Sequence, residues 1–280
     1  MRIDSHHHIW DLSVRDQDWI TGEAMQPIHQ NFSMSDLREA IAGVEISKTV
    51  LVQTVADYAE TPELLALAET DPLIAGVVGW LKIDATDAID HLHRYFDLPG
   101  ASYLKSIRDI AQDHPDSNYL GKPETIANVR KLAKFGIAYD LLTKTPELKG
   151  AIELVKSCPD VQFIMDHISK PYISKNIMEP WKTLMTELAS YPNVVCKVSG
   201  LVTESNWHKW KPQDFQPYTN HLIEIFTPQR LMFGSDWPVA TLSGSYAEVV
   251  SLAEFLMQDL APSESENFWS KTATSAYNLS

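Results

Sequence analysis

The stretch Arg2-Ile3-Asp4-Ser5-His6-His7-His8-Ile9-Trp10 opens the pattern that decides the fold, because it joins a strand-like run to a pair of histidines. Side chains two residues apart lie on the same face of a strand, so His6 and His8 are expected to converge while His7 points away. Two neutral imidazoles are costly to bury together unless a cation or a substrate uses their lone pairs. The stretch therefore predicts a strand that ends at a metal or catalytic pocket.

Seven further segments share the apolar, β-branched composition of short buried strands. Most are hydrophobic throughout, as expected for parallel strands that are covered on both faces. With the first segment, the predicted strands cover residues 2–10, 48–55, 74–83, 103–110, 136–142, 162–168, 194–201 and 231–239.

The segments between these strands carry signals for helix starts. An N-cap residue followed by proline or by an acidic residue in the first turn is typical of such a start. These signals are Thr61-Pro62-Glu63, Thr145-Pro146-Glu147, Ser33 with Asp36, and Ser263 with Glu266.

Strand and helix therefore alternate eight times, which predicts one (β/α)8 TIM-barrel domain over residues 1–280. A final helix is expected to end at Tyr277-Asn278-Leu279. The longer insertion Thr203–Pro217 follows the seventh strand, and loops in that position lie at the catalytic face of a barrel. This insertion is expected to cover the site.

Composition narrows the class of protein. The chain has 280 residues, 44% of them hydrophobic, and a formal net charge of −14, so nucleic acid and anionic membranes are unlikely partners. No signal peptide or membrane helix is predicted, which places the protein in the cytoplasm, and a homo-oligomer is left open. Neither Cys158 nor Cys196 lies in a CxxC pair, and Cys196 is expected to be a small buried hydrophobe.

Polar residues recur near the ends of the otherwise apolar strands. Because the carboxyl ends of all eight strands meet at one face of a barrel, these side chains are expected to surround one mouth. After His6 and His8, they are Gln53, Arg108, Asp140, His167, Lys197, Ser199 and Asp236.

Each of these residues also has a structural explanation. His167 could be a buried core histidine, Asp236 could cap the following helix, and Arg108 could form a structural ion pair rather than hold a substrate oxygen. Asp140 and Lys197 could pair with other barrel residues. Ser199 is equally open between a substrate contact and a residue that shapes the strand end.

Aromatic and loop residues complete the candidate substrate site. Gln53, Trp80 and Trp237 are predicted to line the pocket, although large aromatic residues at strand ends are often plain core. His208 would touch the substrate if the insertion folds over the mouth, and would otherwise be solvated.

Five motifs in order along the chain resemble those of the amidohydrolase superfamily, and specifically its amidohydrolase 2, lactonase-like branch. That branch includes L-fuconolactonase, L-rhamnonolactonase-type enzymes and 2-pyrone-4,6-dicarboxylate lactonases. The motifs are Asp4-Ser5-His6-His7-His8-Ile9-Trp10, Lys105-Ser106-Ile107-Arg108, Asp166-His167-Ile168-Ser169-Lys170-Pro171, Lys197-Val198-Ser199-Gly200-Leu201 and Phe233-Gly234-Ser235-Asp236-Trp237-Pro238.

The resemblance implies hydrolysis of a sugar-acid lactone or related ester ring on a barrel scaffold. It implies that His6, His8 and Asp236 hold one divalent metal, zinc before manganese or iron, with His167 as a further ligand or substrate contact. Asp140 stands where a ligand histidine is common, which argues against a binuclear centre. Some members of this branch work without a metal.

In the expected mechanism, Asp236 accepts a proton from water, and the resulting hydroxide attacks the carbonyl carbon. Arg108 and His167 would stabilise the oxyanion or orient the ring. Two alternatives remain. The same residues could support metal-dependent, non-oxidative decarboxylation of an aromatic or unsaturated acid, or the barrel could bind a ligand without catalysis.

Overall fold

The computed structural model describes residues 1–279 and contains eight parallel strands in one sheet, ordered β1 to β8 as in the sequence. The ends of the sheet meet, because Asp236 donates its backbone N–H to the carbonyl of His6 (2.8 Å) and His8 donates to that of Trp237 (2.7 Å). The predicted barrel is confirmed. The strands are β1 Ile3–His7, β2 Lys48–Val52, β3 Ile74–Gly79, β4 Leu104–Ile110, β5 Ala138–Leu142, β6 Phe163–Met165, β7 Val194–Val198 and β8 Leu231–Phe233.

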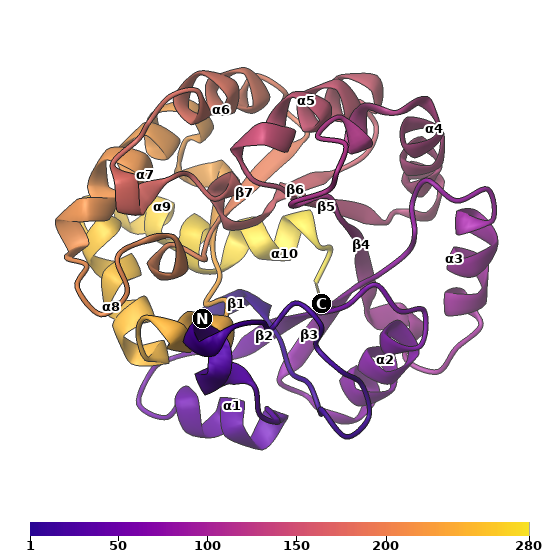
Figure 1. Cartoon of the computed structure of the whole chain (residues 1–280), viewed down its shortest axis with the longest axis horizontal. Coiled ribbons are helices and arrows are strands. Elements are labelled where there is room, and N and C mark those ends of the chain that lie inside the picture. Colours follow the sequence, from indigo (N-terminus) through magenta and orange to yellow (C-terminus); the bar gives the residue numbers. More distant parts are fainter. Residues whose placement is uncertain (280) are drawn as a thin grey trace.

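Eight helices follow the strands and surround them, as Figure 1 shows. They shield the outer face of the sheet from water, which lets the strands be apolar on both faces. These helices are α1 Met34–Ala40, α2 Glu60–Thr70, α3 Ala88–Phe96, α4 Pro123–Leu132, α5 Leu148–Ser157, α6 Trp181–Ala189, α7 Pro212–Phe226 and α8 Tyr246–Leu256.

The chain ends in two short helices, α9 (Pro262–Glu266) and α10 (Thr272–Ala276), and α10 lies across the middle of the view in Figure 1. Ala273, Ala276 and Tyr277 pack against side chains inside the barrel, among them Ile3 and Val50. The C-terminal helix therefore covers the end of the barrel at which the strands begin.

The predicted helix starts hold in part. Ser33 and Asp36 form the expected capping box of α1. Helix α2 instead begins at Glu60, because the Thr61 hydroxyl accepts the backbone N–H of Trp80 (2.9 Å) and does not cap.

Three other boundaries also shift. Thr145 opens a short 3-10 turn whose N-cap is Lys144, and Pro262 rather than Ser263 begins α9. Part of the Thr203–Pro217 insertion is the first turns of α7, so the loop after β7 is shorter than predicted.

Six strands end three to six residues earlier than predicted, β4 and β5 being the exceptions, and two of these early ends matter for the site. β6 ends at Met165 and β8 at Phe233, so His167 and Asp236 lie in the loops that follow. Both residues have positive φ, 51° and 58°, which a strand does not permit. Cys196 is buried as expected. Among residues 1–279, no helix is both long and apolar enough to cross a membrane.

Candidate active site

The histidine pair of β1 has the predicted arrangement. The Nε2 atoms of His6 and His8 lie 3.1 Å apart, while His7 points the other way and bonds the hydroxyl of Thr49 (3.0 Å). His8 Nδ1 lies 2.8 Å from the carbonyl oxygen of Val52, which can only accept. Nδ1 of His8 therefore carries the proton, and Nε2 presents a lone pair to the site.

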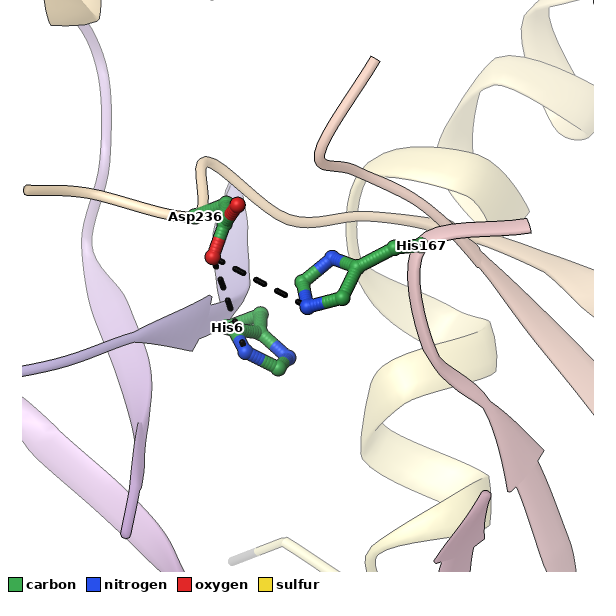
Figure 2. A group of neighbouring side chains, drawn as sticks. All are labelled: His6, His167 and Asp236. Atoms are coloured by element: carbon green, nitrogen blue, oxygen red, sulfur yellow. Dashed lines mark ion pairs between the residues drawn. The ribbon is translucent and has the colours of Figure 1, made fainter. Parts of the chain in front are cut away.

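His167 and Asp236 complete a cluster at the mouth, where they point toward His6 in Figure 2. Oδ1 of Asp236 lies 3.9 Å from Nε2 of His6, 3.6 Å from that of His8 and 3.8 Å from that of His167. The four side chains are buried, although they come from three distant parts of the chain.

The donor atoms of this cluster fit a divalent metal. Ligand atoms of His6, His167 and Asp236 lie within 4.8 Å of one another. The separation of 3.1 Å between the His6 and His8 nitrogens is close to that of two ligands about 2 Å from one ion. Imidazole nitrogens with a carboxylate oxygen are a donor set that zinc, manganese and iron all accept.

A buried charge network lies behind His6. Lys197 is fully buried, and its ammonium lies 2.6 Å from Asp140, 2.8 Å from Asp166 and 3.0 Å from Nδ1 of His6. Asp140 also accepts hydrogen bonds from Ser106 and Tyr277, each at 2.6 Å. The two carboxylates compensate the buried ammonium, as a buried charge requires.

Two groups compete for Nδ1 of His6. Lys197 can donate to this nitrogen, while Oδ1 of Asp166, 3.4 Å away, can accept from it. When Nδ1 gives its proton to Asp166, Nε2 keeps a lone pair for a ligand. When Lys197 donates to Nδ1, Nε2 carries the proton instead and donates to His8.

Arg108 has the structural ion pair that the sequence offered as one of its two possible roles. Its guanidinium pairs with Asp166 (3.0 Å) and donates to the carbonyl of Gln53 (2.6 Å). Nε of Arg108 is buried without a hydrogen-bond partner among residues 1–279. The structural ion pair is therefore present, and Arg108 also belongs to the wall of the cavity above the cluster.

A cavity of about 720 Å³ opens above this cluster. Its wall includes His8, Arg108, His167, Lys170 and Asp236. The loop after β1 forms the other side, with Arg15, Asp16 and Asp18. The cavity is large enough for a sugar-sized molecule, and it reaches the histidines and the carboxylate at its base.

Several expected substrate contacts lie outside the wall of this cavity. Trp80 donates its indole N–H to Asp109 (2.9 Å), and Trp237 packs on Phe32 with 5.4 Å between ring centroids. Asp140 is fully committed to the network below His6. For these three residues, the structural reading fits the geometry better than the substrate contact.

The remaining expected contacts are indirect or remote. Gln53 lies behind Arg108, and the Ser199 hydroxyl bonds Nδ1 of His167 (2.9 Å), so both hold other site residues in place. His208 lines a separate cavity of about 430 Å³ with Trp210 and Glu248. It does not reach the cavity above the histidines.

Sequence reasoning missed some residues of the wall. Lys170 was quoted within a motif but given no role, and its place in a turn after a strand was the available signal. Arg15, Asp16 and Asp18 were missed because the long loop after β1 has no regular period to read.

Burial and neighbouring charges set the protonation of the cluster. Burial lowers the pKa of His167 to about 3, which keeps this imidazole neutral. Burial alone would raise the pKa of Asp236, but interactions with His167 and His8 and the positive charge of Lys170 hold this pKa below its usual range. Asp236 is therefore a carboxylate that can accept a proton.

Comparisons with known proteins agree with this geometry. The family model described as Amidohydrolase matches residues 3–279. An L-fucono-1,5-lactonase of Burkholderia multivorans (strain ATCC 17616 / 249) is 31% identical over 290 residues, which cover 100% of this chain and 96% of that protein. An L-fucono-1,5-lactonase of Burkholderia ambifaria is 31% identical over 247 residues, or 88% of this chain and 83% of that protein.

A solved structure extends the likeness to three dimensions. An amidohydrolase from Burkholderia multivorans, crystallised with bound zinc, superposes with a TM-score of 0.92 and 32% identity. The match covers 100% of both chains.

Proposed function

This chain belongs to the amidohydrolase family, and from that premise we propose that it hydrolyses the ring ester of a sugar-acid lactone, a small-molecule substrate. The observation that carries the proposal is the meeting of His6, His8, His167 and Asp236 in one cluster, of which His8, His167 and Asp236 line a single cavity. The names of the similar Burkholderia proteins, both L-fucono-1,5-lactonases, favour a sugar-derived lactone.

A single divalent metal is part of the proposal, with zinc as the first choice. His6, His8, His167 and Asp236 would hold it, and the related zinc-bound structure supports that choice. When bound, such an ion polarises a carbonyl and lowers the pKa of water to about 7.

The residues of the chain have separate roles in the proposed reaction. Asp236, held as a carboxylate, takes a proton from the attacking water, and the water oxygen bonds to the carbonyl carbon. The bond from that carbon to the ring oxygen then breaks, and Asp236 returns the proton to the ring oxygen. Ser199 orients His167 throughout, and Asp166 fixes Arg108 at the wall.

Decarboxylation and ligand binding without turnover are less well supported. Two relatives that are 31% identical and match 88% and 100% of this chain carry lactonase names, and the complete cluster argues against a barrel that has lost catalysis. Release of carbon dioxide would identify a decarboxylase directly.

The test is a panel of aldonolactones followed with a pH indicator, because each opened ring releases one acid. Metal-depleted and zinc-loaded protein should be measured side by side. We expect turnover of at least one lactone, with Asp236→Asn reducing kcat by about 100-fold to 10,000-fold.

Asp160→Asn, the same substitution at an exposed position in the turn before β6 and away from the mouth, serves as the matched control. Full activity of Asp236→Asn would refute the proton acceptor. No turnover of any lactone by wild type would refute the reaction class.

A further inference from the structure

The segment after β6 has an unusual backbone. His167, Ile168, Ser169 and Lys170 are four consecutive residues with positive φ, at 51°, 48°, 57° and 44°. This left-handed region is strained for residues that carry a Cβ, and it normally holds single glycine or asparagine residues. Strain of this kind persists where the surroundings enforce it, often at functional sites.

Neighbouring residues enforce this turn from both sides. The indole N–H of Trp181 donates to the carbonyl of Ile168 (2.6 Å), and the hydroxyls of Ser169 and Thr143 bond each other (2.8 Å). Lys170 also donates its backbone N–H to the carbonyl of His167 (2.8 Å). As a result, His167 and Lys170 both reach the cavity wall.

The charge of Lys170 distinguishes it from the other cations of this wall. Arg15 is paired with Asp57 (2.7 Å) and Glu63 (3.0 Å), and Arg108 is paired with Asp166 (3.0 Å). Within residues 1–279, the half-buried Lys170 has no carboxylate oxygen within 4.0 Å and its ammonium makes no hydrogen bond. Its charge acts on the carboxyl groups of Glu204 and Asp236 without pairing with either, so its hydrogen-bond donors remain available to a molecule in the cavity.

We propose that Lys170 is a catalytic residue whose ammonium donates a hydrogen bond to the carbonyl oxygen of the lactone, a role that rests on the proposed function. As the water oxygen bonds to the carbonyl carbon, the π electrons of the C=O bond move to this oxygen and make it negative. A positive donor placed there stabilises the charge as it develops. Arg108 is less suited to this task, because Asp166 already balances its charge.

The same contact predicts binding of the product. When the ring C–O bond breaks, its electron pair goes to the ring oxygen, which takes the proton held by Asp236. The former carbonyl oxygen becomes part of a carboxylate once the new acid group loses its proton to solvent. Lys170 should therefore hold the acid product more strongly than it holds the neutral lactone.

The experiment compares Lys170→Met and Lys170→Arg with the exposed control Lys175→Met, which removes a lysine five positions along the same loop. Lactone turnover gives kcat and KM, and calorimetry gives the affinity for the corresponding aldonate. We expect Lys170→Met to lower kcat by about 100-fold to 1000-fold and to weaken aldonate binding, with Lys170→Arg restoring part of both. Lys175→Met should match wild type.

A fourth variant, Lys170→Gly, separates chemistry from structure. It removes the side chain but relieves the left-handed strain, so its unfolding midpoint should not fall, while its kcat should fall as far as that of Lys170→Met. If an active wild type is matched in kcat by Lys170→Gly, the proposal is overturned. If wild type opens no lactone, the proposed function is wrong. In that case, equal affinities of wild type and Lys170→Met for the aldonate would overturn the Lys170 proposal as well.

Discussion

At the scale of single residues, the position of His167 depends on what lies directly beside it. Gly200 has φ 61°, and a Cβ added there would lie 2.8 Å from Nδ1 and 2.9 Å from Cβ of His167. Ser199, the residue before it, holds the same imidazole by a hydrogen bond. The Ser199-Gly200 pair therefore fixes both the rotamer of His167 and how closely its imidazole packs against the backbone of β7's following loop.

Gly200→Ala should consequently lower lactonase activity by more than its loss of folding stability accounts for. Gly136 offers a matched control, because it has φ 65° and no atom within 4 Å of an added Cβ. Each alanine should cost about 1–2 kcal/mol of stability for left-handed backbone, and Gly200→Ala should cost about 1–3 kcal/mol more for overpacking. Urea unfolding and lactone kinetics measure both effects. Equal activity of the two variants would show that the His167 contact is unimportant.

The residues that could be predicted from sequence are those whose role follows from strand periodicity. The convergence of His6 and His8 followed from their spacing, and the proximity of His167 and Asp236 followed from the geometry of a barrel. The alternative that Lys197 pairs with a barrel carboxylate is confirmed, but the identity of the carboxylates could not be predicted, because it depends on which inward-facing side chains meet across the barrel. Lys170 was missed because its place in a turn after a strand does not reveal which way its side chain points, which depends on the left-handed backbone.

At the scale of elements, the eight strands were predictable because buried parallel strands are apolar throughout, whereas their ends were not. β6 and β8 are each three residues long, and the turns that follow them have positive φ at His167 through Lys170 and at Asp236. The start of a helix was predicted correctly where a side chain caps it, as Ser33 does. It was predicted at the wrong residue where the expected capping side chain is engaged by a tertiary contact, as Thr61 is.

Helix α8 permits a test of one cap by pH. Hydrogen bonds from the backbone and then the side chain of Ser245 lower the pKa of Glu248 below its ordinary 4.5. Because the pKa is lowered on folding, the stabilisation is present above about pH 4.5 and is lost as pH falls through the folded-state value. Glu248→Gln should cost about 0.3–1 kcal/mol at pH 7, and the difference from wild type should shrink in acid.

Chemical unfolding from pH 7 down to the acid limit of the fold measures this difference. Glu187→Gln, at an exposed position inside α6, is the control, since it removes the same charge without disturbing a cap. If the difference in unfolding free energy between wild type and Glu248→Gln stays constant with pH, the carboxylate of Glu248 does not stabilise the cap.

At the scale of the whole molecule, one buried chain of contacts links the two ends of the barrel. Tyr277, directly after α10, donates its hydroxyl to Asp140, Asp140 holds Lys197, and Lys197 reaches His6 at the mouth. The final helix was predictable, but the entry of Tyr277 into the barrel interior was not, because helical periodicity does not reveal which side chain fills a closed sheet. The extent of the domain, the oligomeric state and the cytoplasmic location stay predictions.

Tyr277→Phe tests whether this link supports the fold. The substitution removes one donor from a fully buried carboxylate, so the free energy of unfolding should fall by about 1–3 kcal/mol. Tyr172→Phe is the control, because the Tyr172 hydroxyl is half-buried and makes no hydrogen bond within the described residues. Because Asp140 keeps Ser106 and Lys197 as partners, Tyr277→Phe should still fold, and its unfolding midpoint in urea can be compared directly with that of Tyr172→Phe. Equal midpoints would mean that the C-terminal end contributes only apolar packing, and that the charge network below His6 is held by the barrel strands alone.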